Sequence, residues 1–240
     1  MMIKIFTDEA AVAAQIAADM SAGLDVEAPV FCLASGSTPA KGYKMFYETY
    51  GNDERLSKLN IVSLDEWVGI EKHNNGSCYG MLDTDLFKHL NMLDEQIVFY
   101  DGTGDLTLEC ARVDEFIEKN PMTFSLMGVG MNGHIGLNEP GFVDLDKSSV
   151  VGLSPTTKTV AQKYFDEPTV LEEGITLGLF QIIKSERVLV VITGAHKADI
   201  VKKIIEDKDA TLPATRLLGF EHITFYLDEA AASKLTNKGG

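Results

Sequence analysis

The residues with the clearest chemical potential lie in the segment GVGMNGHIGLNEPG, residues 128–141. It follows the apolar run 123–127, which is typical of a buried strand. Its first six residues fit the G-x-G-x-x-G pattern of a dinucleotide-binding turn, and that pattern requires a helix directly after the third glycine. Two more glycines and a proline follow Gly133 and exclude a sustained helix there. We therefore interpret the segment as a polar loop at a strand end, carrying His134 and Glu139.

His134 is either a structural histidine or a group that transfers protons. It lies between glycines, and Glu139 is near enough in sequence to orient its ring or raise its pKa. A Ser-His-acid triad would need a nucleophile elbow, and the chain contains no G-x-S-x-G. The other histidines form no H-x-x-x-H pair, so we expect no metal site. Acid–base chemistry without a metal ion is the most economical interpretation.

A second candidate is the turn ASGSTP, residues 34–39, between an expected strand and an expected helix. Its free amides and the helix dipole favour a phosphate or another anion. The alternative is an ordinary helix start, with Thr38 as its cap and Pro39 at the first helical position.

Charged side chains provide the remaining candidates. Asp65 and Glu66 end another expected strand, where a carboxylate partly shielded by Trp67 either acts as a general base or lies in a solvated loop or helix cap. Lys163 and Lys197 either neutralise a bound phosphate or are ordinary surface lysines.

These segments need a scaffold, and the chain alternates β-rich runs with helical patterns. Such alternation predicts an α/β fold of three layers, a mostly parallel sheet with helices on both faces. Ligands of open parallel sheets bind outside the carboxyl ends of the strands, so we expect the three segments above and the turn 193–197 to converge on one crevice. The middle of the chain is expected to be rich in loops. Without internal repeats or linkers, residues 1–240 are expected to form a single domain. Strands are expected at 3–6, 30–33, 61–64, 97–100, 123–127, 187–193 and 223–227, and helices at 8–22, 77–90, 106–119, 195–206 and from the 34–39 turn to about 50.

Composition narrows the class of protein further. With 45% hydrophobic and 24% charged residues among 240, the chain is expected to be a soluble globular protein without a membrane span or signal peptide. Three widely spaced cysteines predict neither disulfides nor structural zinc, and favour the cytoplasm. A net charge of −15 argues against nucleic acid and anionic membranes as partners. An anionic substrate would therefore need a locally positive pocket.

Taken together, the motifs resemble the glucosamine-6-phosphate deaminase/isomerase family. The resemblance extends from about residue 30 to residue 200 and is carried by SGSTP, LDEWVG, GVGMNGHIGLNEPG, GITLGL and TGAHK. The related 6-phosphogluconolactonases typically have DER in place of DEW and lack the Asn-Glu-Pro of residues 138–140. The resemblance implies a modified Rossmann-like α/β sandwich that binds no dinucleotide and needs no cofactor.

The resemblance also implies roles for individual residues. Asp65 looks like the base that moves a proton between C2 and C1 of the sugar, and His134 would open the sugar ring while Glu139 holds it. Asn132 falls where longer members have an aspartate and shorter members commonly have asparagine. Lys163 falls where deaminases usually have arginine, and a lysine keeps the charge but loses the bidentate fork. The phosphate-binding residues implied are Ser35, Gly36, Ser37, Thr38, Gly128, Lys163 and Lys197.

Within the family, Trp67 in place of the usual tyrosine, together with residues 174–179, resembles the galactosamine-6-phosphate branch. That branch would form tagatose 6-phosphate and ammonia; the alternative, glucosamine 6-phosphate, would yield fructose 6-phosphate and ammonia. A lactonase and a non-catalytic sugar-phosphate sensor are further alternatives, and a sensor would need neither Asp65 nor His134. Because family members are often assemblies, a homo-oligomer is compatible with this interpretation.

Overall fold

The alternating pattern folds into a seven-stranded sheet. The computed structural model describes residues 2–141 and 144–236. Every neighbouring pair of strands in this sheet runs parallel, as strand–helix–strand crossovers require. In order across the sheet, the strands are β1 (Met2–Phe6), β10 (Ile223–Asp228), β9 (Val188–Ile192), β6 (Phe124–Gly128), β2 (Val30–Leu33), β3 (Asn60–Ser63) and β5 (Ile97–Val98).

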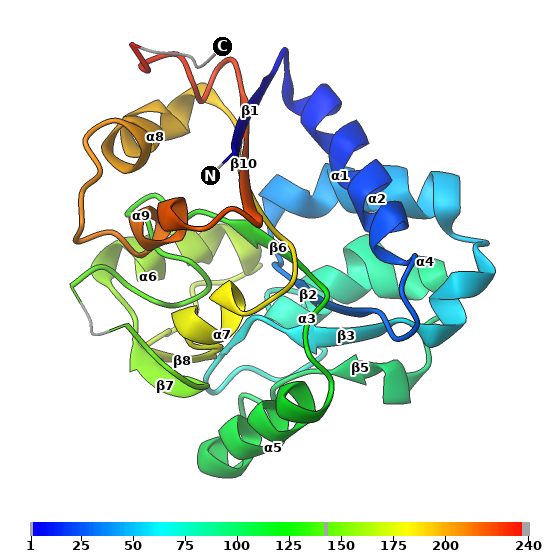
Figure 1. Cartoon of the computed structure of the whole chain (residues 1–240). Helices are drawn as coiled ribbons and strands as arrows, with labels where there is room; N and C mark the ends of the chain where they lie inside the picture. The colour runs from blue at the N-terminus through cyan, green and yellow to red at the C-terminus, as the bar shows by residue number, and fades with distance from the viewer. Residues whose placement is uncertain (1, 142–143, 237–240) are drawn as a thin grey trace.

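Alternate side chains of each strand supply two separate cores, one on each face of the sheet. Phe31 and Leu33 of β2 pack with α1 and α2, whereas Cys32 between them packs with α5, α7 and α8. Figure 1 shows α1 and α2 on one side of the sheet and α8 on the other. The predicted three-layer α/β fold is therefore confirmed. The bounds of these helices are Glu9–Gly23 (α1), Ser37–Tyr50 (α2), Leu106–Lys119 (α5), Leu179–Ile183 (α7) and Ala198–Ile205 (α8).

A second sheet of three antiparallel strands was not expected from the sequence. It consists of β4 (Asp65–Trp67), β8 (Glu173–Thr176) and β7 (Ser149–Gly152), in the order β4-β8-β7. The sequence placed Asp65 and Glu66 at the end of the preceding strand, whereas the structure places them on the separate strand β4. The middle of the chain, expected to be rich in loops, also contributes β7 and β8 to this sheet. Strands of three or four residues are too short to show a hydrophobic period. Their pairing holds Asp65 opposite Thr176, on a strand instead of a loop.

Several elements differ in detail from their predicted bounds. The helix expected at 77–90 starts at the cap Ser77 but is interrupted by a π turn, Asp83–Phe87, between α3 (Cys78–Leu82) and α4 (Lys88–Leu90). A 3₁₀ turn, Ala195–Lys197, precedes α8. Two short helices complete the described chain, α6 (Pro155–Ala161) and α9 (Pro213–Arg216). None of the helices within residues 2–141 and 144–236 combines the length and the apolar character that a membrane span requires.

Candidate active site

The carboxyl ends of β2, β3, β6 and β9 meet at one pocket of about 260 Å³. All four segments that the sequence placed at this edge contribute side chains to it, as the parallel topology requires. Gly36, Asn132 and Glu139 do not line the pocket but lie next to residues that do. The predicted site residues that line it are Ser35, Ser37, Thr38, Asp65, Gly128, His134, Lys163 and Lys197.

The turn after β2 leads into α2 earlier than expected. The helix starts at Ser37, so Gly36 is its cap and Pro39 its third residue, and Thr38 is not the cap. Gly36 has φ of 95°, a conformation that glycine adopts readily and other residues rarely, and it turns the chain directly into the helix. No side chain caps this end. The first amides of α2 are therefore free to bind an anion, and Ser37 and Thr38 place hydroxyls beside them.

The ammonium groups of Lys163 and Lys197 reach the same pocket from two different turns. Lys197 donates a hydrogen bond to the Val129 carbonyl oxygen at 2.6 Å. Burial, together with the smaller effect of the Lys163 charge, lowers the pKa of Lys197 to about 8. Lys163 lies in the 3₁₀ turn Gln162–Tyr164 that follows α6. The pocket is therefore locally positive, as an anionic substrate of an acidic protein would need.

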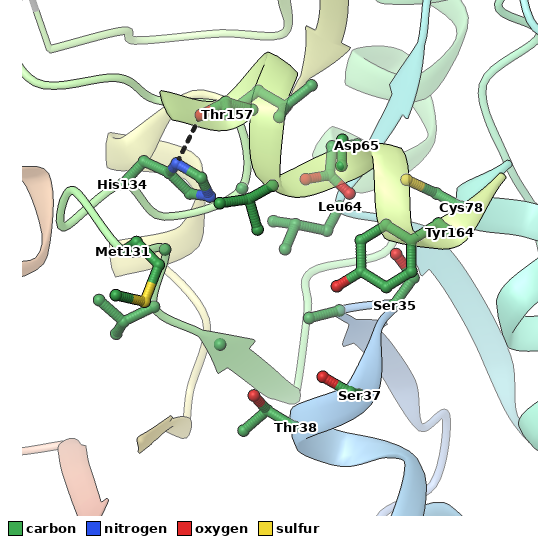
Figure 2. A pocket seen from close by; sticks show the side chains of 18 of the residues that line it. Ser35, Ser37, Thr38, Leu64, Asp65, Cys78, Met131, His134, Thr157 and Tyr164 are labelled. Carbon is green, nitrogen blue, oxygen red and sulfur yellow. Dashed lines mark hydrogen bonds between the residues drawn. The ribbon is translucent and has the colours of Figure 1, made fainter. Parts of the chain in front are cut away.

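Asp65 and Glu66 occupy different environments although they are adjacent. Glu66 is buried and accepts backbone hydrogen bonds from Trp67, Cys78 and Tyr79 at 2.8–3.0 Å, which ties β4 to the start of α3. Asp65 faces the pocket instead (Figure 2). Burial raises the pKa of Asp65 to about 6, although the charge of His134 and a hydrogen bond from the Cys78 thiol both lower it. Asp65 therefore has the pKa of a carboxylate that can take and return a proton near neutral pH.

The loop after β6 contains no helix and holds the ring of His134 against Gly130. A Cβ atom on Gly130 would lie 2.3 Å from Cε1 of that ring, so only glycine leaves room for it. The His134 amide donates to the Asn132 side-chain oxygen at 3.3 Å. The imidazole Nδ1 lies 3.1 Å from Thr157 Oγ1 (Figure 2). It also lies 3.5 Å from Glu139 Oε2. The G-x-G-x-x-G pattern thus positions a histidine and opens no helix.

Glu139 is buried behind the histidine in a hydrogen-bond network. Its carboxylate accepts from Asn132 Nδ2 at 2.7 Å and from the Ser154 amide at 3.2 Å. Burial raises the pKa of Glu139, but the hydrogen bond and positive charge of His134, with Thr157 and Asn132, lower it to about 2. An ionised carboxylate can only accept, so the network assigns a proton to His134 Nδ1 and leaves Nε2 for a substrate.

Sequence reasoning missed several polar groups at this pocket, and three of them bear on its chemistry. The hydroxyls of Thr157 and Tyr164 and the thiol of Cys78 all line it. Thr157 and Tyr164 lie in and just after α6, a region where no strand end marked a site. Cys78 starts α3, and its distance of thirteen positions from Asp65 gives no signal of contact. Among the described residues, no group of three or more His, Cys, Asp or Glu side chains is arranged to hold a metal ion.

Comparisons with known proteins agree with this geometry. The family model of glucosamine-6-phosphate isomerases/6-phosphogluconolactonase matches residues 8–225. A glucosamine-6-phosphate deaminase of Pediococcus pentosaceus is 35% identical over 218 residues, which cover 88% of this chain and 89% of that protein. The corresponding enzyme of Clostridium novyi is 34% identical over 211 residues, with 86% and 88% covered.

Solved structures show the same architecture. A monomeric glucosamine-6-phosphate deaminase superposes with a TM-score of 0.91 at 26% identity, covering 97% of this chain and 99% of that one. A 6-phosphogluconolactonase from Trypanosoma cruzi reaches a TM-score of 0.78 at 19% identity, with 98% and 97% covered, and so shares the fold. The Rossmann-like fold expected from the resemblance is thereby confirmed.

The fold and the pocket place this protein in a class of α/β proteins with a polar site at the carboxyl edge of a parallel sheet. The chain belongs to the family of glucosamine-6-phosphate isomerases and 6-phosphogluconolactonases. The predicted family and enzyme class are confirmed.

Proposed function

We propose that this protein converts glucosamine 6-phosphate and water to fructose 6-phosphate and ammonia. One observation carries the proposal: Asp65 and His134 face a single pocket whose wall also includes the Ser35–Thr38 turn and two lysines. Such a pocket offers a proton-transfer end and an anion-binding end. The distribution of these groups suits an aldose that carries a phosphate remote from its reacting carbons.

Binding of the phosphate involves the turn and the lysines. The free amides at the start of α2 and the hydroxyls of Ser37 and Thr38 donate to the phosphate oxygens. Lys163 and Lys197 supply the countercharge. Gly128 lines the pocket, and a Cβ built on it would meet no atom within 4 Å, so the sugar can approach the β6 backbone there.

His134 opens the sugar ring. With Nδ1 held by Glu139 and Thr157, Nε2 takes the proton from the hydroxyl on C1 and returns it to the ring oxygen as the C1–O5 bond breaks. Asn132 Nδ2 donates to Glu139 Oε2 at 2.7 Å, and Asn132 Oδ1 accepts from the His134 amide at 3.3 Å. Asn132 therefore helps to fix both His134 and Glu139. The product of this step is the open-chain amino aldehyde.

Asp65 then moves the proton that converts aldose to ketose. With a pKa of about 6 it is mostly ionised at neutral pH, so it can remove the proton from C2 and deliver it to C1 through an enol intermediate. In the same conversion the amino nitrogen loses one proton and the aldehyde oxygen gains one. The resulting imine at C2 is hydrolysed by water, which releases ammonia and leaves the ketone. Hydrogen atoms and charge balance without any external oxidant or cofactor.

The identity of the hexosamine depends on the orientation of the C4 hydroxyl. The names of the relatives from Pediococcus pentosaceus and Clostridium novyi support glucosamine 6-phosphate. Trp67 supports galactosamine 6-phosphate as the second candidate, because a tryptophan at this position resembles the galactosamine-6-phosphate branch. The side chain lines the pocket, and its indole nitrogen donates a hydrogen bond to the Gly76 carbonyl oxygen at 3.1 Å. A tyrosine in its place would present a hydroxyl that the indole lacks.

Ammonia release from the two sugar phosphates, measured side by side, tests the proposal. We expect glucosamine 6-phosphate to give the higher kcat/KM. A higher kcat/KM for galactosamine 6-phosphate would reverse the assignment of the substrate. Absence of ammonia release from both sugar phosphates would contradict the proposed reaction. If the protein then hydrolysed 6-phosphogluconolactone, a lactonase would be the better assignment.

A small-molecule substrate remains the only partner that we propose. The net charge of −15 opposes nucleic acids and anionic membranes, and the cytoplasm is the location that suits a phosphosugar enzyme. The homo-oligomer considered from the sequence stays a prediction, and light scattering of the purified protein tests it.

A further inference from the structure

The phenol of Tyr164 is a pocket group without a task in the reaction described above. It ends the 3₁₀ turn Gln162–Tyr164, and Figure 2 shows its hydroxyl directed toward the start of α2. A Cβ atom on Gly36 would lie 2.8 Å from this hydroxyl oxygen. Within residues 2–141 and 144–236 the hydroxyl makes no hydrogen bond. A free donor therefore lies directly over the anion-binding turn.

The two lysines of the pocket make a neutral hydrogen-bond donor more favourable at the phosphate site than a third cation. Lys163 and Lys197 are close enough for the charge of one to lower the pKa of the other. A third cation would add to this repulsion, whereas a phenol donates a hydrogen bond without adding charge. A hydrogen bond to a phosphate oxygen is charge-assisted and stronger than one between neutral groups.

Because Lys163 and Tyr164 share one 3₁₀ turn, the ammonium group and the phenol enter the pocket together. Lys163 and Tyr164 are adjacent, and the Lys163 Nζ lies 4.8 Å from the centre of the Tyr164 ring. Gly36 accommodates the hydroxyl because it has no side chain, and its φ of 95° independently favours glycine. Any larger residue at position 36 would displace the phenol from the turn.

We propose that the Tyr164 hydroxyl is a further phosphate ligand, which donates a hydrogen bond to the phosphoryl group held over the Ser35–Thr38 turn. This inference rests on the proposed function, because it assigns one more group to the same phosphate site. It makes Tyr164 a residue that discriminates phosphorylated from unphosphorylated sugars.

Calorimetric binding of inorganic phosphate to the whole protein tests this role. Tyr164→Phe removes only the hydroxyl, and loss of one hydrogen bond to a charged group should raise the Kd about tenfold. Tyr47→Phe is the matched control, because Tyr47 lies on α2 with its ring stacked on His89 and does not line the pocket. Its Kd should equal that of the wild type. An equal or tighter Kd for Tyr164→Phe would overturn the proposal.

A kinetic measurement separates this proposal from the proposed function. With glucosamine 6-phosphate as substrate, Tyr164→Phe should raise KM by more than it lowers kcat. If phosphate binding depends on Tyr164 but the wild type releases no ammonia, the reaction is wrong and the phosphate ligand stands. If the wild type releases ammonia and Tyr164→Phe binds phosphate normally, the ligand is wrong and the reaction stands.

Discussion

Thr157 Oγ1 lies 3.1 Å from His134 Nδ1, nearer than the Glu139 carboxylate oxygen at 3.5 Å. The threonine is itself held in place, because its hydroxyl receives a hydrogen bond from Ser154 Oγ at 3.1 Å and its amide donates to the same oxygen at 3.2 Å. Two buried groups therefore fix the imidazole, one uncharged on α6 and one ionised in the loop after β6. The start of α6 thereby orients a histidine from a distant segment.

Removal of the Thr157 hydroxyl should impair the histidine without unfolding the protein. We expect Thr157→Val, which keeps the side-chain shape, to lower kcat for ammonia release about tenfold, the value of one buried hydrogen bond. Thr157→Ser should recover most of the activity, because it restores the hydroxyl. Thr159→Val on the exposed side of α6 is the control and should retain the wild-type rate. A fully active Thr157→Val variant would show that Glu139 orients the ring alone.

A side chain at position 130, which would crowd the His134 ring, should also lower kcat. In Gly130→Ala the new methyl group would overlap the imidazole, since the distance to its Cε1 atom is 2.3 Å. We expect kcat to fall by about 10²-fold, as for a catalytic group displaced by about 1 Å. Gly152→Ala is a suitable control, because its methyl group meets no atom within 4 Å. Equal steady-state rates for the two alanine variants would mean that the ring position is unimportant.

The pH dependence of the reaction should follow the ionisation of Asp65. A general base must be ionised, so kcat/KM should fall as the pH is lowered through about 6, the pKa of Asp65. The Cys78 thiol lowers that pKa by its hydrogen bond. Cys78→Ala should therefore move the acidic limb of the profile to higher pH, and Cys78→Ser should move it back. An acidic limb at the same pH in all three proteins would contradict this role for the thiol.

The stability of the protein should depend on pH through Glu139. Its pKa is about 2 in the folded protein and about 4.3 in an unfolded chain. The folded state thus gains stability from the ionised carboxylate above about pH 4.3 and loses it as the pH falls toward 2. Glu139→Gln should lower the Tm at pH 7, and the difference from the wild type should shrink near pH 2. A constant difference across this range would indicate that the ionisation of Glu139 does not contribute.

The sequence predicted the site well where parallel topology determines it. Ser35, Asp65 and His134 each follow a strand of the parallel sheet, and the carboxyl ends of these strands necessarily meet at one edge. Their identities also carried the family resemblance. The roles given to them from the resemblance stay predictions, as does the single domain over residues 1–240.

The sequence could not predict contacts that depend on the second sheet and on α6. Strands β4, β7 and β8 are short, and the pairing of β4 with β8 joins residues more than a hundred positions apart, as for Asp65 and Thr176. Thr157 and Tyr164 reach the pocket only because tertiary packing places α6 and the turn after it in the pocket wall. No local pattern records such packing, since propensity and periodicity describe only neighbours along the chain.

The most direct test of the account is the Asp65→Asn variant, because the proposal gives Asp65 the proton transfer between C2 and C1. Ammonia release from glucosamine 6-phosphate and calorimetric binding of inorganic phosphate should be measured on the same preparation. We expect kcat to fall by about 10²–10⁴, as for loss of a general base, while phosphate binding is not weakened. Ammonia release at the wild-type rate would contradict the central claim and remove Asp65 from the reaction.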